Sequence, residues 1–503
     1  MRFFTAILFI VFVSIQTANS QSCGDCRFLS LVFDSVTVET VLFGEGPNID
    51  GDTQQLYMDI YQPFGDTMTN RPVMVFAFGG GFVQGSRDDW YVKEVGNYFA
   101  GAGYVGVAID YRYGIDPLEI LFLQHMRIFF RAMQDMRAAI QYLRADYDIL
   151  GNNYKIDTAN IFVGGGSAGG ITALMHSYCD KPSEISEMGD ISALDDLGGF
   201  YATTGFYPGY NWKAKATFNV SGALINQDWV ESGDIPIISV HGDADEVVPY
   251  AYGPFGDGLL GGIFDLHGSW AVDSTARAKG VCSYLYTMEG LGHPSEDMGM
   301  DYIRSVVARM GQKIHAVYRG ETFCCPMEVD AEPGDTLYYS PGDPATEVFA
   351  TITNDTTNVN ITWCSAVCGI AEIGSSVSVI PDSTIEFLTV VASDGHCQAD
   401  DLHIVTEAVI DTSSSIFEIE NGLEIKVFPT PANHQLFLNV NSDGWFDNQM
   451  KVVFYDVTGK MHLQKMLQPS MSLDVATLPA GEYLLSVLKD HHILVTKKVQ
   501  ICR

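Results

Sequence analysis

Residues 163–170 read Val163-Gly-Gly-Gly-Ser-Ala-Gly-Gly170, so that five glycines surround a single serine, Ser167. The apolar run 160–163 leads into them, and a helix-like run over 170–178 follows. Each glycine loses extra backbone freedom on folding, so a cluster of glycines indicates a backbone shape that other residues cannot adopt. One interpretation is a loose surface loop. The other is a sharp turn from a strand into a helix that presents Ser167 as a nucleophile.

Strand-like apolar runs alternate with helix-like stretches on both sides of this turn. The runs cover 56–61, 73–78, 105–109, 161–163, 216–220, 235–240 and 283–288, and one helix candidate covers 130–146. Alternation of this length predicts a doubly wound α/β fold, with a mostly parallel sheet covered by helices. In such a fold the reactive groups lie beyond the carboxyl ends of the strands.

A serine becomes a good nucleophile only when a base takes its proton, and that base is usually a histidine that a carboxylate orients. In an α/β sheet with a Gly-x-Ser-x-Gly turn, the partners follow the serine in the order acid and then histidine. Asp245 stands in an acidic loop after a strand-like run and is the predicted acid, with Asp243 and Glu246 as alternatives. His293 stands on a glycine-rich loop after the next such run and is the predicted base.

Three glycines, at 79–81, follow the strand-like run 73–78. They form either a plain loop or a turn that directs backbone N–H groups at an acyl oxygen as it gains negative charge. The predicted oxyanion hole consists of the N–H groups of Gly80 and Gly81, together with that of Ala168, the residue after the serine.

The charge and the N-terminus bear on partners and location. The formal net charge is −34 over 503 residues, so there is no basic surface to meet the phosphates of a nucleic acid or an anionic membrane. Residues 1–20 combine Arg2, a long apolar run and small residues at the end, which predicts a signal peptide cleaved before Gln21. No later run is long and apolar enough to span a bilayer.

The composition changes where the helix–strand alternation ends. Between Gly320 and Ile425 there is no lysine or arginine, and strand-like runs recur between turn residues. From Lys426 onward, lysines return. The predicted domains are an α/β domain at 21–320, an acidic immunoglobulin-like β-sandwich at 321–420 and a second small all-β sandwich at 421–503.

Ten cysteines fit an exported protein with disulfides. Cys23 and Cys26 are interpreted as a local disulfide, because no second pair of cysteines or histidines stands nearby to complete a zinc site. Among the later cysteines the preferred pair is Cys364 with Cys397, since both flank strand-like runs. The acidic turns of the middle region could hold Ca²⁺, but no run matches an EF-hand pattern, which favours a solvated acidic surface. Neither a metal nor a cofactor is expected.

Six motifs together resemble one family of enzymes. They are Tyr57-Met-Asp-Ile-Tyr61, FGGGFVQGS at 78–86, Ala108-Ile-Asp-Tyr-Arg112, GGGSAGG at 164–170, HGDADEVVP at 241–249 and GLGHP at 290–294. Over about residues 31–320 the chain resembles α/β-hydrolase carboxylesterases of the feruloyl and acetyl-xylan esterase-like group. The resemblance implies a Ser-Asp-His triad and hydrolysis of carboxylic esters without a cofactor. Its H-G-x-x-D pattern implies Asp245 as the acid, whereas His241 is interpreted as a structural residue beside a turn glycine.

Two features depart from the resembled group. Phe78 stands where many members have a histidine before the three glycines. Because the predicted hole uses backbone N–H groups, this difference bears on the substrate more than on activity. The segment between Asp245 and His293 is longer than usual, and its aromatic stretch 250–264 and Trp270 either line a pocket or pack only on themselves.

Three C-terminal motifs, VFPTPAN at 427–433, FYDVTGK at 454–460 and LPAGEY at 478–483, resemble the sorting domain of the type IX secretion system of Bacteroidetes. From its residues alone, this β-sandwich is equally consistent with a carbohydrate-binding or adhesive module. The resemblance implies that the type IX machinery is a partner. The protein is then expected in the medium or on the cell surface of a Gram-negative bacterium.

The sequence therefore predicts a secreted serine esterase that forms an acyl-enzyme, with acylated plant polysaccharides or small acyl esters as substrates. One alternative is a serine peptidase of the prolyl-oligopeptidase kind, but too few residues precede Val73 to build the propeller that this family usually carries. The other is a non-catalytic surface protein that binds glycans or mediates adhesion. A complete set of triad residues argues against that alternative.

Overall fold

A computed structural model of the chain describes residues 26–115, 126–188, 191–256, 265–294 and 299–332 without further gaps. Beyond these it describes 336–339, 346–354, 359–365, 371–379, 387–407, 415–419, 423–428, 435–442, 450–456, 460–467, 470–475, 478–479, 481–489 and 492–501. The predicted signal peptide at 1–20 lies outside the described residues, as does Cys23.

The described residues form two compact units. The first comprises those within Met1–Glu332, Val348–Val377 and Phe387–His403, and the second comprises those within Pro333–Glu347, Ser378–Glu386 and Ile404–Arg503. None of the helices in the described part of the chain combines the length and the apolar character that crossing a bilayer requires.

The first unit is built on an eight-stranded sheet with the order β1-β2-β4-β3-β5-β6-β8-β11. These strands are β1 (Val36–Pro47), β2 (Thr53–Pro63), β3 (Arg71–Ala77), β4 (Val105–Ile109), β5 (Ile156–Gly166), β6 (Thr217–Val220), β8 (Ile237–Gly242) and β11 (Ser283–Met288). β1, β2 and β4 pair antiparallel, and all neighbours from β4 to β11 pair parallel. The predicted doubly wound, mostly parallel sheet is confirmed.

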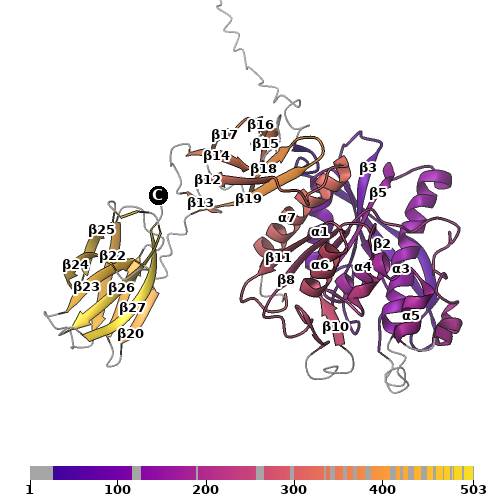
Figure 1. The fold of residues 1–503 in the computed structure, drawn as a ribbon, viewed down its shortest axis with the longest axis horizontal. Coiled ribbons are helices and arrows are strands. Elements are labelled where there is room, and N and C mark those ends of the chain that lie inside the picture. The colour runs from indigo at the N-terminus through magenta and orange to yellow at the C-terminus, as the bar shows by residue number, and fades with distance from the viewer. Residues whose placement is uncertain are drawn as a thin grey trace, which may run out of the picture. The chain divides into compact units, whose positions relative to one another are not determined.

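Helices cover both faces of this sheet. They are α1 (Trp90–Gly101), α3 (Met126–Ala145), α4 (Ala168–Tyr178), α5 (Pro182–Met188), α6 (Ser269–Ala278) and α7 (Gly299–Arg319). There are also a short π-helical segment, η2 (Asp146–Leu150), and two 3₁₀ helices, η3 (Ile191–Leu197) and η4 (Gln227–Trp229). Connections between parallel strands are right-handed. The chain moves one way across the sheet from β3 to β4 and the opposite way from β4 onward, so α1 lies on one face and α3, α4 and α6 lie on the other. α7 packs against α1, and α3 packs against α4 (Figure 1).

The central strands are apolar because both of their faces are covered. Every residue of β3, β4, β6 and β8 is buried, whereas β1 at the edge of the sheet is largely exposed or half-buried. Parallel strands between two layers of helices need near-continuous apolar runs. A separate small sheet joins β7 (Ala223–Leu224), β10 (Asp265–Gly268) and β9 (Tyr252–Pro254) beside the last strands.

Two further sheets follow α7, with the orders β12-β14-β17 and β13-β19-β18-β15-β16. Their strands are β12 (Glu328–Glu332), β13 (Thr336–Tyr339), β14 (Thr346–Thr353), β15 (Asn360–Ser365), β16 (Ala371–Ile373), β17 (Ser376–Val379), β18 (Phe387–Ser393) and β19 (Gln398–Glu407). Within the first unit, the start of β19 contacts α7, where Lys313 Nζ lies 2.8 Å from Asp400 Oδ2. The domain boundaries and the immunoglobulin-like character stay predictions.

Disulfides within the first unit overturn both predicted pairings. The bonded pairs are Cys26 with Cys364, Cys282 with Cys324, and Cys325 with Cys397. Cys26 is therefore not bonded to its neighbour at 23, and its partner is 338 residues away in sequence. Two of these bonds join the predicted α/β domain to residues beyond 320.

The predicted pair Cys364–Cys397 fails for a reason of strand direction. β15 runs antiparallel to β18, with Asn360 opposite Ser393. Cys397 follows the end of β18 and so lies near Asn360, whereas Cys364 lies four residues further along β15, about 13 Å away at the usual rise per residue. A disulfide requires Cα atoms within about 7 Å of each other.

In the second unit, two four-stranded sheets form a β-sandwich. One sheet contains β20 (Ser415–Ile419), β21 (Leu423–Phe428), β22 (Gln435–Ser442) and β25 (Ser470–Asp474), and the other contains β24 (Met461–Met466), β23 (Lys451–Asp456), β26 (Gly481–Lys489) and β27 (His492–Ile501). Leu436 and Leu473 from the first sheet share one buried cluster with Phe454 and Leu485 from the second. Side chains from two facing sheets in one core define a sandwich, and the predicted small all-β region after the α/β fold is confirmed.

Candidate active site

The predicted site residues all follow parallel strands of the eight-stranded sheet. Gly80 and Gly81 follow β3, Ser167 follows β5, Asp245 follows β8 and His293 follows β11. Because parallel strands end at the same edge of a sheet, residues far apart in sequence converge there. The structure brings these five residues together at that edge.

Ser167 occupies the sharp turn between β5 and α4. Its backbone has φ 54° and ψ −120°, a conformation that a residue with a side chain rarely adopts. The surrounding backbone comes so close that a Cβ on Gly165 would lie 2.1 Å from the carbonyl carbon of Gly169, and a Cβ on Gly169 would lie 2.1 Å from the carbonyl oxygen of Ala77. Glycine at both positions is therefore required, which explains the Gly-x-Ser-x-Gly pattern around Ser167.

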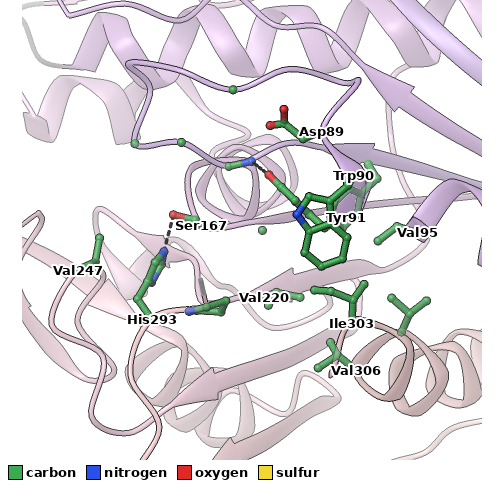
Figure 2. A pocket seen from close by; sticks show the side chains of 18 of the residues that line it. Asp89, Trp90, Tyr91, Val95, Ser167, Val220, Val247, His293, Ile303 and Val306 are labelled. Atoms are coloured by element: carbon green, nitrogen blue, oxygen red, sulfur yellow. Dashed lines mark hydrogen bonds between the residues drawn. The ribbon is translucent and has the colours of Figure 1, made fainter. Parts of the chain in front are cut away.

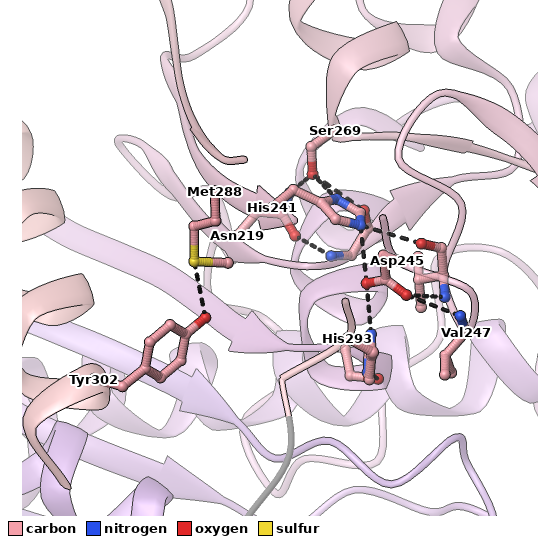
Figure 3. A network of polar contacts seen from close by, with 11 residues as sticks. Asn219, His241, Asp245, Val247, Ser269, Met288, His293 and Tyr302 are labelled. Atoms are coloured by element: carbon pink, nitrogen blue, oxygen red, sulfur yellow. Dashed lines mark hydrogen bonds and ion pairs between the residues drawn. The ribbon is translucent and has the colours of Figure 1, made fainter. Parts of the chain in front are cut away.

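A hydrogen-bonded chain connects Ser167 to His293 and Asp245. Ser167 Oγ lies 2.9 Å from His293 Nε2, and His293 Nδ1 lies 2.7 Å from Asp245 Oδ2 (Figures 2 and 3). An ionised carboxylate can only accept, so the proton of the neutral ring lies on Nδ1. Nε2 is then free to accept the proton of the Ser167 hydroxyl.

Asp245 is a fully buried carboxylate that is held ionised. Its Oδ1 accepts the backbone N–H groups of Val247 and Val248, each at 2.9 Å. Burial alone would raise its pKa, but hydrogen bonds from His241, His293 and the backbone hold the pKa of Asp245 well below its ordinary value. The carboxylate therefore stays charged through neutral and mildly acidic pH.

The two alternative acids lie elsewhere. Asp243 Oδ1 accepts the backbone N–H of Gly290 at 2.6 Å, so this side chain shapes the loop that leads to His293 rather than contacting the ring. Glu246 is exposed. The H-G-x-x-D pattern and the geometry thus single out the same carboxylate.

The loop after β3 presents backbone N–H groups beside Ser167. Gly80 and Gly81 have φ values of +111° and +62°, and in the described part of the chain neither N–H donates a hydrogen bond. The N–H of Gly79 donates to the Tyr91 hydroxyl at 2.5 Å and is already occupied. Ala168 is the first residue of α4, so its N–H has no acceptor within the helix.

Two anchors hold this loop in place. Phe78, the departure from the resembled group, is buried and stacks on Tyr111 with ring centroids 4.2 Å apart. At the far end of the loop, Arg87 Nε lies 3.1 Å from Asp59 Oδ2, and one of its terminal nitrogens lies 2.8 Å from Asp110 Oδ2. The apolar anchor at Phe78 explains why an aromatic residue is suitable before the three glycines.

Ser167 and His293 line a cavity of about 560 Å³. Its walls away from the triad are mostly apolar and come from β3, β6, α1 and α7, namely Phe76, Phe218, Val220, Val95, Ile303, Val306 and Val307. Trp90 and Tyr91 lie across the cavity from His293 (Figure 2). Burial raises the pKa of Tyr91 to about 12, so its hydroxyl stays neutral.

The described part of the long segment before His293 contributes little to this cavity. Val247 lines it, whereas Trp270 is 51 % exposed and is not among the described residues that line it. Residues 257–264 of the predicted aromatic stretch lie outside the described residues. In the residues that the structure describes, no group of three or more His, Cys, Asp or Glu side chains is placed to hold a metal ion.

Two parts of the chain match known protein families. Residues 58–196 match the BD-FAE family. This chain carries an esterase domain of the α/β-hydrolase fold. The matched part of the esterase domain contains the glycine loop and Ser167 and ends before Asp245 and His293. Residues 426–502 match the secretion system C-terminal sorting domain, and this type IX sorting domain indicates secretion or a cell-surface location.

Solved structures similar to the esterase domain share little sequence with it. Thermogutta terrifontis esterase 2 phosphorylated by paraoxon is 19 % identical, with 56 % of this chain and 93 % of that chain covered and a TM-score of 0.39. The propionate-bound form of the same esterase is 21 % identical, with 54 % and 90 % covered and a TM-score of 0.36. A truncated carbohydrate esterase from gut microbiota is 16 % identical, with 57 % and 98 % covered and a TM-score of 0.38. No curated protein matches the sequence significantly.

Sequence reasoning missed three side chains of the esterase domain that the structure places at the site. Tyr91 occupies the N–H of Gly79, and His241 with Ser269 lies behind Asp245. His241 carried a signal, because it is the first residue of H-G-x-x-D and stands four residues before the acid. Ser269 and Tyr91 carried none, since both are near the site only through the packing of helices.

Proposed function

We propose that the protein is a secreted serine esterase that cleaves carboxylic esters through an acyl-enzyme. The observation that carries this proposal is the continuous chain from Ser167 through His293 to Asp245 at the wall of the cavity. The esterase domain and the sorting domain support the coarser parts of the proposal, namely ester hydrolysis and export.

Acylation uses the triad and the glycine loop. Ser167 Oγ attacks the ester carbonyl carbon while His293 Nε2 takes the hydroxyl proton. The carbonyl oxygen gains negative charge, which the N–H groups of Gly80, Gly81 and Ala168 stabilise. The bond to the alcohol oxygen then breaks, and His293 gives its proton to the departing alcohol. Asp245 stays ionised throughout and stabilises the positively charged ring.

Deacylation repeats these steps with water. His293 takes a proton from a water molecule, and the resulting oxygen attacks the acyl carbon. The bond between that carbon and Ser167 Oγ breaks, the serine recovers its proton from His293, and the carboxylic acid leaves. Every proton in this cycle moves through Nε2, and no cofactor is needed.

The lining of the cavity indicates which half of the ester, the acyl chain or the alcohol, binds inside it. The apolar walls supplied by β6, α1 and α7 suit the acyl chain rather than a hydroxyl-rich alcohol, because a buried hydroxyl without a partner is costly. The alcohol then leaves toward solvent, where a bulky group such as a polysaccharide can be accommodated. The substrates consistent with this arrangement are acylated plant polysaccharides and small acyl esters.

A panel of p-nitrophenyl esters with acyl groups of increasing size, together with acetylated xylan, feruloylated arabinose and matched p-nitrophenyl amides, tests the proposal. We expect turnover of esters without added metal, and little or no turnover of amides. Turnover of peptide amides in preference to esters would favour a peptidase. A folded protein that turns over none of them would favour the non-catalytic alternative.

Substitution of Gly80 by alanine tests the oxyanion hole. A Cβ at this position would lie 2.1 Å from the carbonyl oxygen of Gln84, and φ is +111°, so the loop must shift and its N–H groups must move. We expect kcat to fall by about 10²–10³-fold, the usual cost of losing one such donor. The measurement is kcat on a p-nitrophenyl ester.

Gly51→Ala is the matched control, because Gly51 also has a positive φ of +82° but nothing lies within 4 Å of its Cβ position. Its kcat should stay within about twofold of the wild type, since any cost is confined to local backbone strain. Unchanged kcat in a folded Gly80→Ala variant would remove this loop from the mechanism.

Removal of the chain from Asn421 onward tests the role of the tail. All proposed site residues belong to the first compact unit, so the purified truncated protein should hydrolyse esters with kcat within about twofold of the full chain. In the native host, the same truncation should trap activity in the periplasm. Ester hydrolysis is measured in periplasmic, surface and medium fractions. Normal release of the truncated protein would contradict the sorting role.

A further inference from the structure

We propose that His241 is a positioning residue of the catalytic triad, which holds Asp245 and its loop from behind, on the side opposite His293. This inference rests on the proposed serine-esterase function. His241 is fully buried at the end of β8, four residues before Asp245, and does not line the cavity. It therefore acts through Asp245 and not on the substrate.

One ring nitrogen of His241 faces two groups that can only accept. His241 Nε2 lies 3.1 Å from the carbonyl oxygen of Val248 and 3.2 Å from Asp245 Oδ2 (Figure 3). A carbonyl and an ionised carboxylate have no proton to give, so Nε2 must carry the proton. The same Val248 donates its backbone N–H to Asp245 Oδ1. His241 thus holds one carboxylate oxygen directly and the other through the backbone of Val248.

The opposite ring nitrogen is held by a buried polar chain. His241 Nδ1 lies 2.7 Å from Ser269 Oγ, and Asn219 Nδ2 donates to that oxygen at 2.8 Å. With Nε2 protonated, Nδ1 of the neutral ring accepts a hydrogen bond from the Ser269 hydroxyl. The Asn219 side chain is itself fixed, because its Oδ1 accepts the backbone N–H of Gly222 at 2.9 Å. The orientation of the His241 ring is therefore set before any substrate binds.

Asp245 Oδ2 consequently lies between two imidazole rings, 2.7 Å from His293 Nδ1 and 3.2 Å from His241 Nε2. Among the residues that the structure describes, the other titratable groups facing this pair are two tyrosines. The Tyr250 ring meets His241 edge-on with centroids 5.6 Å apart. Burial, followed by the charge of Asp245, raises the pKa of Tyr302, which stays neutral. Asp243 and Glu246 on the same loop are exposed. Without the His241 donor, the negative charge of Asp245 would therefore act more strongly on His293.

Two substitutions of His241 separate positioning from packing. His241→Phe fills the space but removes the donor, and His241→Gln keeps an N–H donor close to the Nε2 position. We expect His241→Phe to lower kcat by about 10–100-fold, less than loss of the carboxylate itself. KM should change little, because the cavity wall is untouched. The acid limb of the pH profile of kcat/KM should move to higher pH by roughly half a unit or more, because a fuller negative charge on Asp245 favours the protonated form of the base. His241→Gln should recover most of kcat and the wild-type acid limb.

His315→Phe is the matched control for a buried histidine. His315 lies on α7, is buried and contacts Gln398 Oε1 at 2.9 Å, without touching the triad. We expect it to lower Tm while leaving kcat and the acid limb unchanged. If His241→Phe does not fold, Ser269→Ala carries the test, because it frees the ring at Nδ1. It should lower kcat several-fold with unchanged KM.

A substrate-free measurement keeps the inference distinct from the proposed function. In protein with ¹⁵N-labelled histidine, the titration of the ring at position 293 can be followed by NMR, and it should move to higher pH in His241→Phe. Wild-type protein without ester turnover would overturn the proposed function, while this titration still tests the coupling. Folded His241→Phe with wild-type kcat, acid limb and titration would overturn the inference. Equal losses in His241→Phe and His241→Gln would also overturn it.

Discussion

Substitution of Ser167 by alanine is expected to lower kcat on esters by at least about 10⁴-fold, because the proposed acyl-enzyme cannot form without its hydroxyl. The fold should be kept, since the turn depends on Gly165 and Gly169. Within the described residues, the side chain of Ser167 forms a hydrogen bond only with His293. The measurement is kcat on a p-nitrophenyl ester, with circular dichroism to verify folding. A residual rate above that of water is expected from the oxyanion hole.

Ser177→Ala is the matched control for this change. Ser177 lies on the same helix, α4, and its Oγ accepts from Thr217 at 2.6 Å, away from the cavity. We expect its kcat within about twofold of the wild type, with a loss of stability of about 1 kcal/mol for one hydrogen bond. If Ser167→Ala retained wild-type turnover, another nucleophile or a direct attack by water would have to replace the proposed mechanism.

Replacement of Asp245 by asparagine is expected to lower kcat by at least about 100-fold, and as much as about 10⁴-fold, through the wrong tautomer of His293. The structure indicates how the amide must orient. The N–H groups of Val247 and Val248 require an acceptor at the Oδ1 position, so the amide nitrogen must take the Oδ2 position. There it would face the Nδ1 of His293 as a donor. The ring then moves its proton to Nε2, which can no longer accept from Ser167.

Asp243→Asn is the control that distinguishes the two carboxylates. In the part of the chain that the structure describes, Asp243 accepts only the backbone N–H of Gly290 in the loop before His293, and an asparagine oxygen can replace it there. Its kcat should change only a few-fold. The reverse result would be a large loss of kcat in Asp243→Asn with kcat of Asp245→Asn near the wild type. It would assign the acid of the triad to Asp243 and leave the proposed roles of Ser167 and His293 unchanged.

The linear sequence determined the α/β fold and the place of the candidate nucleophile. The central strands are buried on both faces, so each reads as a nearly unbroken apolar run that needs no knowledge of its neighbours. The turn at Ser167 depends partly on local geometry, since a Cβ on Gly165 would meet the backbone of Gly169 four residues later, whereas Gly169 is required by its contact with Ala77 of β3. Order along the chain then pointed to the loops that contain Asp245 and His293, because parallel strands bring successive loops to one edge. Within the first of these loops, the H-G-x-x-D pattern of the resembled family selected Asp245.

Contacts between segments that are distant in sequence could not be predicted and became known only from the tertiary structure. The bond from Cys26 to Cys364 crosses 338 residues, and no spacing rule could have selected it over Cys364 with Cys397. The role proposed for His241 likewise depends on Ser269, which α6 brings to 2.7 Å from its ring. Such contacts follow from strand order, strand direction and the angle at which a side chain leaves its element. These quantities are set by the packing of the whole core, and a periodic pattern along the chain does not encode them.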